Sequence, residues 1–140
     1  MYRTKTYQER PLEEINYEID LIFKFLPQTE RVFLADGDAL NLRTEKLVEI
    51  LDYISHKFKN IKRISCYAMP KNLLQKSHSD LETLRNRGLG MLYVGIESGN
   101  DIVLKKVTKG ATSRGIIQAC QKAQIHEYIL SCMVILGIGG

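Results

Sequence analysis

The 140-residue sequence lacks the features that mark several large classes of protein. No apolar run reaches the roughly 18–20 residues that a membrane-spanning helix needs, so no membrane span is predicted. Residues 1–10 are polar and do not resemble a signal peptide. No linker, low-complexity segment or solenoid repeat interrupts the chain. We therefore expect a single domain located in the cytoplasm.

Cysteine is scarce, and its spacing excludes the common metal motifs. Cys66, Cys120 and Cys132 match no zinc or iron–sulfur pattern. Cys66 and Cys132 lie in apolar runs, and free cysteine is among the most buried residue types. The sequence thus predicts three reduced, mostly buried thiols, as is usual in the cytoplasm, and no metal ligand in this chain.

Charge of either sign is not concentrated anywhere in the chain. The net charge is +4, and the composition, 44% hydrophobic and 26% charged, is ordinary for a globular protein. Lysine and arginine are scattered, so they favour an anionic partner only weakly. This pattern does not predict a nucleic-acid partner, and it does not exclude one.

Helix and strand signals alternate along the sequence. Short apolar runs predict buried strands at residues 31–35, 63–67, 91–96 and 129–136. Apolar residues at helical spacing fill the segments between these runs, and a further helix begins after Pro11. The strands start about 30 to 40 residues apart, which is the length of a βα unit with parallel pairing. This predicts an α/β fold whose sheet is covered on both faces or closed into a barrel.

Several residues have the character of helix caps. Thr44 is expected to cap the helix that follows it, and Ser79 with Glu82 matches a capping box. Gly88 is placed to end that helix, since glycine accepts the left-handed backbone of a helix terminus. Asn100 is expected to cap a short helix before the fourth strand.

The residues that follow the strands are the candidates for a ligand site, because ligands of parallel α/β folds gather at the carboxyl ends of the strands. Two of the four junctions, 36–40 and 97–100, contain both glycine and a carboxylate. Glycine allows close approach of the backbone, and carboxylates accept hydrogen bonds from hydroxyls or ammonium. Each residue also has an ordinary reading: Asp36 and Asp38 as turn residues, and Glu97 as the partner of a nearby cation. Their common position at one edge of the sheet favours the ligand site.

Four segments together resemble one enzyme family. Leu92–Gly99, followed by Lys109-Gly-Ala-Thr112, is the most specific, and Phe33–Leu40 carries Asp-Gly-Asp where that family has Gly-Gly-Glu. Val134–Gly140 and Tyr2–Pro11 complete the set. In these segments the chain resembles the radical S-adenosylmethionine (SAM) superfamily, in the branch of oxygen-independent coproporphyrinogen oxidases and methylthiotransferases.

This resemblance implies a fold and an extent. The expected fold is part of a partial (β/α)6 TIM-like barrel, with residues 1–140 as a partial core domain. The family's Cys-x3-Cys-x2-Cys motif is absent from the sequence. By the order of the segments we expect those cysteines upstream of Met1. The first strand, the cluster loop and the C-terminal part of the barrel are likewise expected outside the chain.

The resemblance also implies a reaction and its cofactors. The complete enzyme would cleave SAM reductively at a [4Fe-4S] cluster, using an electron donor, and would generate a 5′-deoxyadenosyl radical. That radical would take hydrogen from a small-molecule or macromolecular substrate that the sequence does not identify. The 140 residues alone are expected to be inactive.

The resemblance assigns SAM contacts to residues at three strand ends. These are Gly37 and Asp38 for the methionine ammonium, Glu97 and Ser98 for the ribose hydroxyls, and Val134, Ile135 and Gly137 for the adenine. A carboxylate and a backbone carbonyl suit the N–H donors of an ammonium group. Apolar surface beside open backbone suits a flat heterocycle.

Two other interpretations stay open. A different β/α-barrel enzyme would use Asp38 and Glu97 as acid and base. A non-catalytic module would bind SAM or a nucleotide without turnover. A cysteine motif just upstream would exclude the first, and binding without turnover by the complete protein would favour the second.

Overall fold

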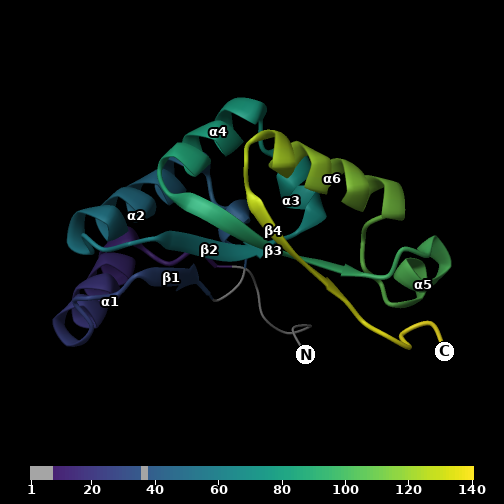
Figure 1. The fold of residues 1–140 in the computed structure, drawn as a ribbon, viewed down its shortest axis with the longest axis horizontal. Coiled ribbons are helices and arrows are strands. Elements are labelled where there is room, and N and C mark those ends of the chain that lie inside the picture. The colour runs from purple at the N-terminus through teal and green to yellow at the C-terminus, as the bar shows by residue number, and fades with distance from the viewer. Residues whose placement is uncertain (1–7, 36–37) are drawn as a thin grey trace.

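Four parallel strands form the centre of the molecule in the computed structural model, which describes residues 8–35 and 38–140 (Figure 1). The strands are β1 (Arg31–Leu34), β2 (Arg63–Ala68), β3 (Leu89–Glu97) and β4 (Ile129–Val134). They lie in the order β1-β2-β3-β4, so each pairs in parallel with the next along the chain. The predicted α/β fold built from parallel βα units is therefore confirmed.

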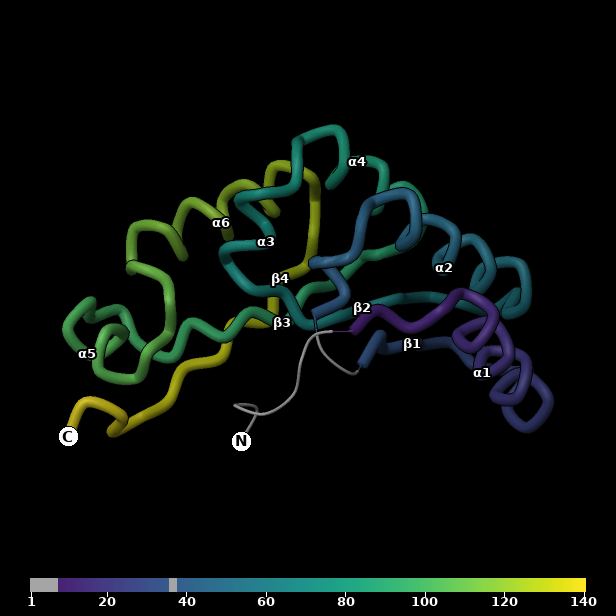
Figure 2. The backbone as a smooth tube through the Cα atoms, turned by 180° about the vertical axis from the view of Figure 1, so that it is seen from behind, coloured from purple at the N-terminus to yellow at the C-terminus, as the bar shows by residue number. Residues whose placement is uncertain are grey.

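Helices connect the strands and cover one face of the sheet. They are α1 (Leu12–Phe25), α2 (Thr44–Lys57), α3 (Pro70–Gln75), α4 (His78–Asn86), α5 (Asp101–Lys106), α6 (Ser113–Ile125) and the short 3-10 helix η1 (Ala39–Asn41). Figures 1 and 2 both show α2, α4 and α6 above the same face of the sheet. None of the described helices combines the length and the apolar character needed to cross a membrane.

The hydrophobic core lies between this helical layer and the sheet. Successive strand residues point to opposite faces, and in β3 the fully buried Leu92 and Val94 face the helices. Leu47 and Leu51 of α2 meet them from the other side with no exposed surface. Burying a leucine side chain contributes about 1.5–3 kcal/mol, so this layer supplies most of the driving force for the fold. The opposite face of the sheet carries Phe33 and Tyr67, which are 39% and 50% exposed.

The capping box of α4 lies two residues before its predicted place. Ser77, not Ser79, is the cap: its hydroxyl accepts from the Asp80 amide at 2.9 Å, and the Asp80 carboxylate accepts from the Ser77 amide at 2.9 Å. The prediction of a box at Ser79 and Glu82 is wrong because the helix already begins at His78. A cap needs extended backbone, which Ser77 has and a residue inside the helix does not.

Other predicted caps have mixed outcomes. Thr44 is the first helical residue of α2, and the preceding Arg43 has the cap conformation without a side-chain cap, so that prediction is wrong. Asn100 accepts from the Ile102 amide at 2.8 Å and caps α5, as predicted. Gly88 follows α4 with a φ of +100°, the left-handed conformation expected of a terminating glycine.

Two segments differ from the predicted elements. The sequence analysis did not anticipate α3, a short helix with Pro70 in its first turn, where the ring matches the helical backbone. The fourth strand ends at Val134 and not at 136, because residues 136–139 form a turn in which Gly137 has a φ of +77°.

The thiols are less uniformly buried than predicted. Cys66 is buried, Cys120 is partly buried and Cys132 is exposed, so the prediction of three mostly buried thiols holds for Cys66 and is wrong for Cys132. Cys132 lies in β4, which is an edge strand of this four-stranded sheet. An edge strand has a neighbour on one side only, and its side chains are correspondingly less covered.

Candidate functional site

Glu97 is held in an unusual backbone conformation at the carboxyl end of β3. Its φ is +63°, in the left-handed region that few residues other than glycine adopt. The pairing of β3 with β4 shifts register between Gly95 and Glu97, which is a bulge directly before this residue. Strained backbone of this kind is retained where surrounding contacts enforce it, and such places cluster at functional sites.

Lys109 forms an ion pair with Glu97. The Lys109 Nζ atom lies 2.9 Å from Glu97 Oε1, and the two side chains are 20% and 23% exposed. The ordinary reading of Glu97 as the partner of a cation is thus realised in the structure. The second carboxylate oxygen, Oε2, accepts no hydrogen bond from the described residues.

Gly95 makes room for this ion pair. A Cβ atom at Gly95 would lie 2.5 Å from Glu97 Oε1 and 2.9 Å from Lys109 Nζ. Alternation along β3 puts Gly95 on the same face as Met91 and Tyr93, opposite the helices. The carboxylate and the ammonium therefore lie over the face of the sheet that the helices leave open, at its carboxyl edge.

The end of β4 lies beside Glu97. Val134 is in register with Glu97, and the Ile135 amide donates to the Glu97 carbonyl at 3.0 Å. Val134 and Ile135 are 61% and 51% exposed, so their apolar side chains are available for a ligand. Gly137 follows with a φ of +77°, and the chain then passes close to α5 (Figures 1 and 2). The structure thus brings Glu97, Val134 and Ile135 together.

Ser98 has a structural role in the loop after β3. Its Oγ atom accepts from the Asn100 amide at 3.1 Å, and its own amide donates to the Ile96 carbonyl at 2.8 Å. These bonds turn the chain into the cap of α5. The hydroxyl keeps its proton for a further acceptor, since a serine hydroxyl both donates and accepts.

Asp38 lies in a different environment from Glu97. It follows β1, while Glu97 ends β3, and β2 lies between them. Two strand spacings of about 4.8 Å put β1 and β3 about 10 Å apart across the sheet. Leu34, which ends β1, is in line with Leu92 through Cys66, so β3 continues for five more residues before it reaches Glu97. No contact joins the two carboxylates among the described residues, and a ligand must be extended to reach both. Gly37 lies outside the described residues.

Asp38 is half-buried and incompletely hydrogen-bonded. The side-chain amide of Asn72 donates to its Oδ2, while Oδ1 is buried without a partner among the described residues. Burial raises the pKa of the Asp38 carboxyl above its ordinary 3.8, and the Asn72 bond and the charge of Lys76 oppose that rise. An unpaired buried carboxylate oxygen is costly, and it indicates a site for a donor that the described residues do not supply.

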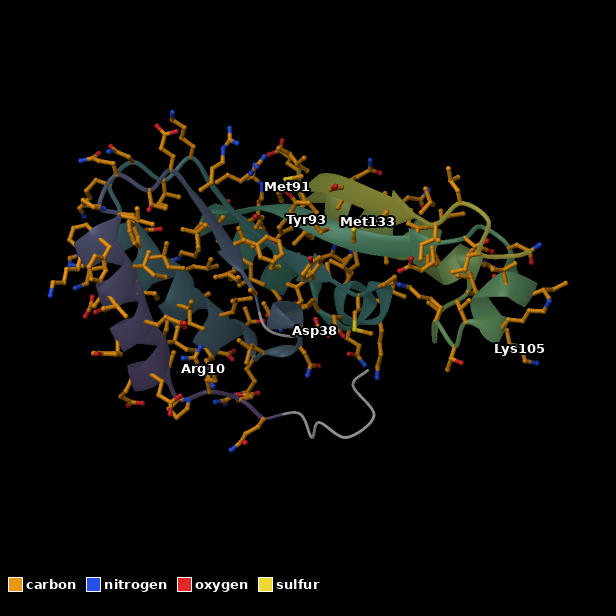
Figure 3. The ribbon with its side chains drawn as sticks, turned by 90° about the horizontal axis from the view of Figure 1, so that it is seen from below. Arg10, Asp38, Met91, Tyr93, Lys105 and Met133 are labelled. Carbon is orange, nitrogen blue, oxygen red and sulfur yellow. The ribbon has the colours of Figure 1, made fainter. Side chains whose placement is uncertain are left out.

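The contacts of Asp38 point toward the helical layer. Asn72 belongs to α3 and is only 4% exposed. Cys66 faces the helices from β2, and its pKa is raised to about 12 by burial and, to a smaller extent, by the charge of Asp38. Figure 3 shows Asp38 well separated from Tyr93 and Met133. The two halves of the expected SAM site thus have different orientations: Glu97 lies over the open face, and Asp38 lies beside α3.

An aromatic cluster covers part of the open face. The ring of Phe33 meets those of Tyr67 and Tyr93 edge to face, with centroids 4.9 and 5.5 Å apart. Met91 and Met133 lie close to Tyr93 over β3 and β4 (Figure 3). This apolar surface is continuous with the Gly95 position. It offers a floor for a planar or apolar group bound near Glu97.

The described residues do not fit an iron–sulfur cluster. They contain no group of three or more histidine, cysteine or carboxylate side chains able to hold a metal ion. Cys66, Cys120 and Cys132 lie on β2, α6 and β4. The described residues do fit part of a nucleoside or amino-acid ligand, since they offer two carboxylates, Glu97 and Asp38, that each have one oxygen without a partner among them.

The sequence analysis did not select three residues of this edge. Lys109 was noted only within the resembling segment, Gly95 only as part of a strand, and Asn72 not at all. Asn72 comes two residues after Pro70, shortly after the strand predicted at residues 63–67. A polar amide so soon after a strand end is the signal in the sequence that could have indicated it.

Comparisons with known proteins agree with the architecture. The family model described as the radical SAM superfamily matches residues 2–140. The heme chaperone HemW of Bacillus subtilis (strain 168) is 23% identical over 115 residues, which are 81% of this chain and 30% of HemW. The chain therefore spans about a third of the length of this curated relative.

Solved structures show the same fold at low sequence identity. Methylornithine synthase (PylB) superposes with a TM-score of 0.71 at 16% identity, covering 97% of this chain and 39% of that one. Coproporphyrinogen III oxidase (HemN) from Escherichia coli superposes with a TM-score of 0.62 at 15% identity, covering 85% and 30%. The four parallel strands thus correspond to part of a TIM-like barrel, as predicted.

Proposed function

The chain belongs to the radical SAM superfamily, and from that membership we propose that it forms the SAM-binding edge of an enzyme that cleaves SAM reductively. The cofactors of this family are SAM and a [4Fe-4S] cluster. Together they supply a 5′-deoxyadenosyl radical, which takes hydrogen from a substrate. The proposal places the cluster ligands outside residues 1–140, and it includes an electron donor.

Glu97 is the principal binding residue in this proposal. Its Oε2 atom accepts from the ribose hydroxyls, with the Ser98 hydroxyl close by. Charge-assisted hydrogen bonds of this kind are shorter and stronger than neutral ones. The conformation of Glu97 is set before a ligand arrives, by the bulge and the ion pair, so little ordering of this side chain is needed on binding.

Val134, Ile135 and Gly137 form the adenine surface in this proposal. The side chains of Val134 and Ile135 are exposed, and the Ile135 amide donates to the Glu97 carbonyl. The loop at Gly137 allows close approach of the backbone. A purine that lies here excludes water from the ribose contacts, which strengthens them.

Asp38 and Gly37 receive the methionine ammonium in this proposal. The orphan Oδ1 of Asp38 is the observation that supports the role, because an ammonium would supply the missing donor. Asp38 lies beside α3, so this contact requires the ligand to extend across the end of β2. The proposed role of Asp38 depends on a ligand that reaches across the end of β2, whereas the proposed role of Glu97 does not.

The three free cysteines support a cytoplasmic location for the enzyme, because thiols stay reduced there. The aromatic floor of Phe33, Tyr67 and Tyr93 supports a substrate with planar or apolar character. Neither observation identifies the substrate.

The single observation that carries the proposal is the Glu97 carboxylate, which projects from a strained backbone at the strand end and has one oxygen without a partner among the described residues. It is tested by titrating SAM calorimetrically into the full-length Glu97→Gln protein with its cluster reconstituted. The variant keeps the shape and loses the charge. We expect about tenfold or more weaker SAM binding, which is the effect of losing one charge-assisted hydrogen bond.

Glu82→Gln is the matched control, because Glu82 is exposed on α4 and should leave SAM affinity unchanged. The iron content of all proteins should be equal, since Glu97 is not expected to be a ligand. If Glu97→Gln bound SAM with wild-type affinity, Glu97 would have only a structural role, as the ion-pair partner of Lys109.

A further inference from the structure

The ion pair between Glu97 and Lys109 gives the second residue a role of its own. We propose that Lys109 is a positioning residue: by holding Oε1 of Glu97 it keeps the carboxylate over Gly95 and leaves Oε2 as the oxygen presented to a ribose hydroxyl. The inference rests on the proposed SAM-binding function of Glu97.

A glutamate at a strand end needs such a restraint. Three side-chain torsions separate its carboxylate from the backbone, and an unrestrained surface glutamate samples many rotamers. The left-handed backbone of Glu97 does not select one of them. The contact of 2.9 Å with Lys109 Nζ fixes one oxygen, and the absence of a side chain on Gly95 leaves the space in which both groups lie.

Lys109 is itself well placed to act as an anchor. Its amide donates to the carbonyl of Leu104 at 3.0 Å, and Leu104 is only 1% exposed. The loop that carries Lys109 is closed at its other end, where the Ser113 amide donates to Asp101 Oδ1 at 2.6 Å. The backbone around Lys109 is thus tied to α5 and α6.

The burial of the pair makes its charge effective. Both side chains are less than a quarter exposed, so solvent and salt screen their attraction less than they screen a surface pair. The exposed pair of Arg87 with Asp52, whose side chains are 52% and 46% exposed, gives the contrasting case. The positioning of Glu97 should accordingly tolerate moderate salt.

The test is whether the protein recognises a ribose hydroxyl, measured by calorimetry on the full-length protein. The two probes are S-adenosylhomocysteine and its 2′-deoxy analogue, and the quantity is the ratio of their dissociation constants. We expect a ratio of about ten in the wild type, from one charge-assisted hydrogen bond. Lys109→Met retains length and loses charge, and it should lower the ratio to about three or less.

Rescue and control variants separate positioning from general structural damage. Lys109→Arg keeps a cation and should restore the ratio to within about twofold of wild type. Lys105→Met removes an exposed lysine of α5 and should leave the ratio unchanged. Lys109→Gln is a second neutral variant, for use if Lys109→Met does not fold, and it should lower the ratio by the same amount. Thermal unfolding of each variant shows whether it folds.

The outcomes for Lys109 and for Glu97 can be told apart. A wild-type ratio in folded Lys109→Met or Lys109→Gln, with a reduced ratio in Glu97→Gln, would overturn the positioning role and leave the proposed function standing. A ratio near one in the wild type would overturn both. In a Glu97→Gln background, removing the charge of Lys109 should not change the ratio further, because the ratio reports the hydrogen bond between Glu97 and the ribose.

Discussion

A Cβ atom on Gly95 would lie 2.5 Å from Oε1 of Glu97, closer than two such atoms can approach. The atoms that it would meet are the far ends of the Glu97 and Lys109 side chains, which can swing away without moving the backbone. The Glu97 carboxylate can therefore occupy its position only because residue 95 has no side chain, although the two residues are not adjacent.

Gly95→Ala should accordingly disrupt the ion pair and leave the fold intact. We expect SAM affinity to fall by about tenfold, as for Glu97→Gln, with little change in the unfolding temperature. Calorimetric titration and a thermal melt measure the two effects. Gly90→Ala in the same strand is the control, since a Cβ there meets nothing closer than 3.9 Å. A loss of stability without a loss of affinity would contradict this reading of Gly95.

Asp38→Asn should stabilise the protein at neutral pH. Burial raises the pKa of the Asp38 carboxyl, so the folded state binds its proton more tightly than the unfolded state, whose pKa is near 3.8. The ionised group therefore destabilises the fold above the folded-state pKa, and this penalty vanishes as the pH falls to the unfolded value. Asparagine removes the charge and keeps an oxygen to accept from Asn72.

Thermal melts across pH 4 to 8 should show that Asp38→Asn unfolds at a higher temperature than wild type near neutral pH. This difference in unfolding temperature should become smaller as the pH falls. Asp52→Asn, at an exposed residue paired with Arg87, should give no such stabilisation at neutral pH. The proposed ammonium contact predicts weaker SAM binding by Asp38→Asn. A gain of stability with a loss of SAM affinity would be the expected trade-off at a binding residue. A difference in unfolding temperature that grew as the pH fell would contradict the argument that burial raises the pKa of Asp38.

Native alkylation should rank the three cysteines by exposure. Cys132 is exposed, whereas Cys66 is buried and its pKa is raised to about 12, so it carries almost no thiolate at neutral pH. Brief treatment with iodoacetamide, followed by peptide mass spectrometry, should find label mainly at Cys132, less at Cys120 and least at Cys66. Equal labelling after denaturation controls for peptide recovery. Rapid labelling of Cys66 in the folded protein would mean that β2 is more accessible than described.

Tyr128→Phe should destabilise the fold without affecting the ligand edge. The Tyr128 hydroxyl donates to the Leu81 carbonyl at 2.8 Å, and the tyrosine is only 4% exposed. Its loss removes one buried hydrogen bond, which costs about 0.5–1.5 kcal/mol. Urea unfolding measures the change, and Tyr17→Phe, at a residue that is 71% exposed, should give a value near zero. Tyr128 precedes the first residue of β4, whereas Glu97 lies beside Val134, the last residue of that strand. A change in SAM affinity in Tyr128→Phe would therefore contradict the expectation that this residue acts only on stability.

The sequence by itself determined the order of the strands and of the helices other than α3 and η1, the parallel pairing and the position of Glu97 at a strand end. These follow from local patterns: apolar runs, the spacing of βα units, and residues such as Asn100 that cap a helix within three positions. A local pattern places its own residue reliably because the interacting groups are near neighbours along the chain. It is less reliable for the register of a cap, as the shift of the α4 box from Ser79 to Ser77 shows.

Only the tertiary structure decided how the site residues are oriented and with which groups they pair. Glu97 meets Lys109 twelve positions away, and Asp38 meets Asn72 thirty-four positions away. The bulge before Glu97, the open space at Gly95 and the exposure of Cys132 likewise depend on which strands are neighbours. Partners so distant in sequence are brought together by packing and not by local periodicity, so the motif alone does not reveal that Asp38 lies beside α3.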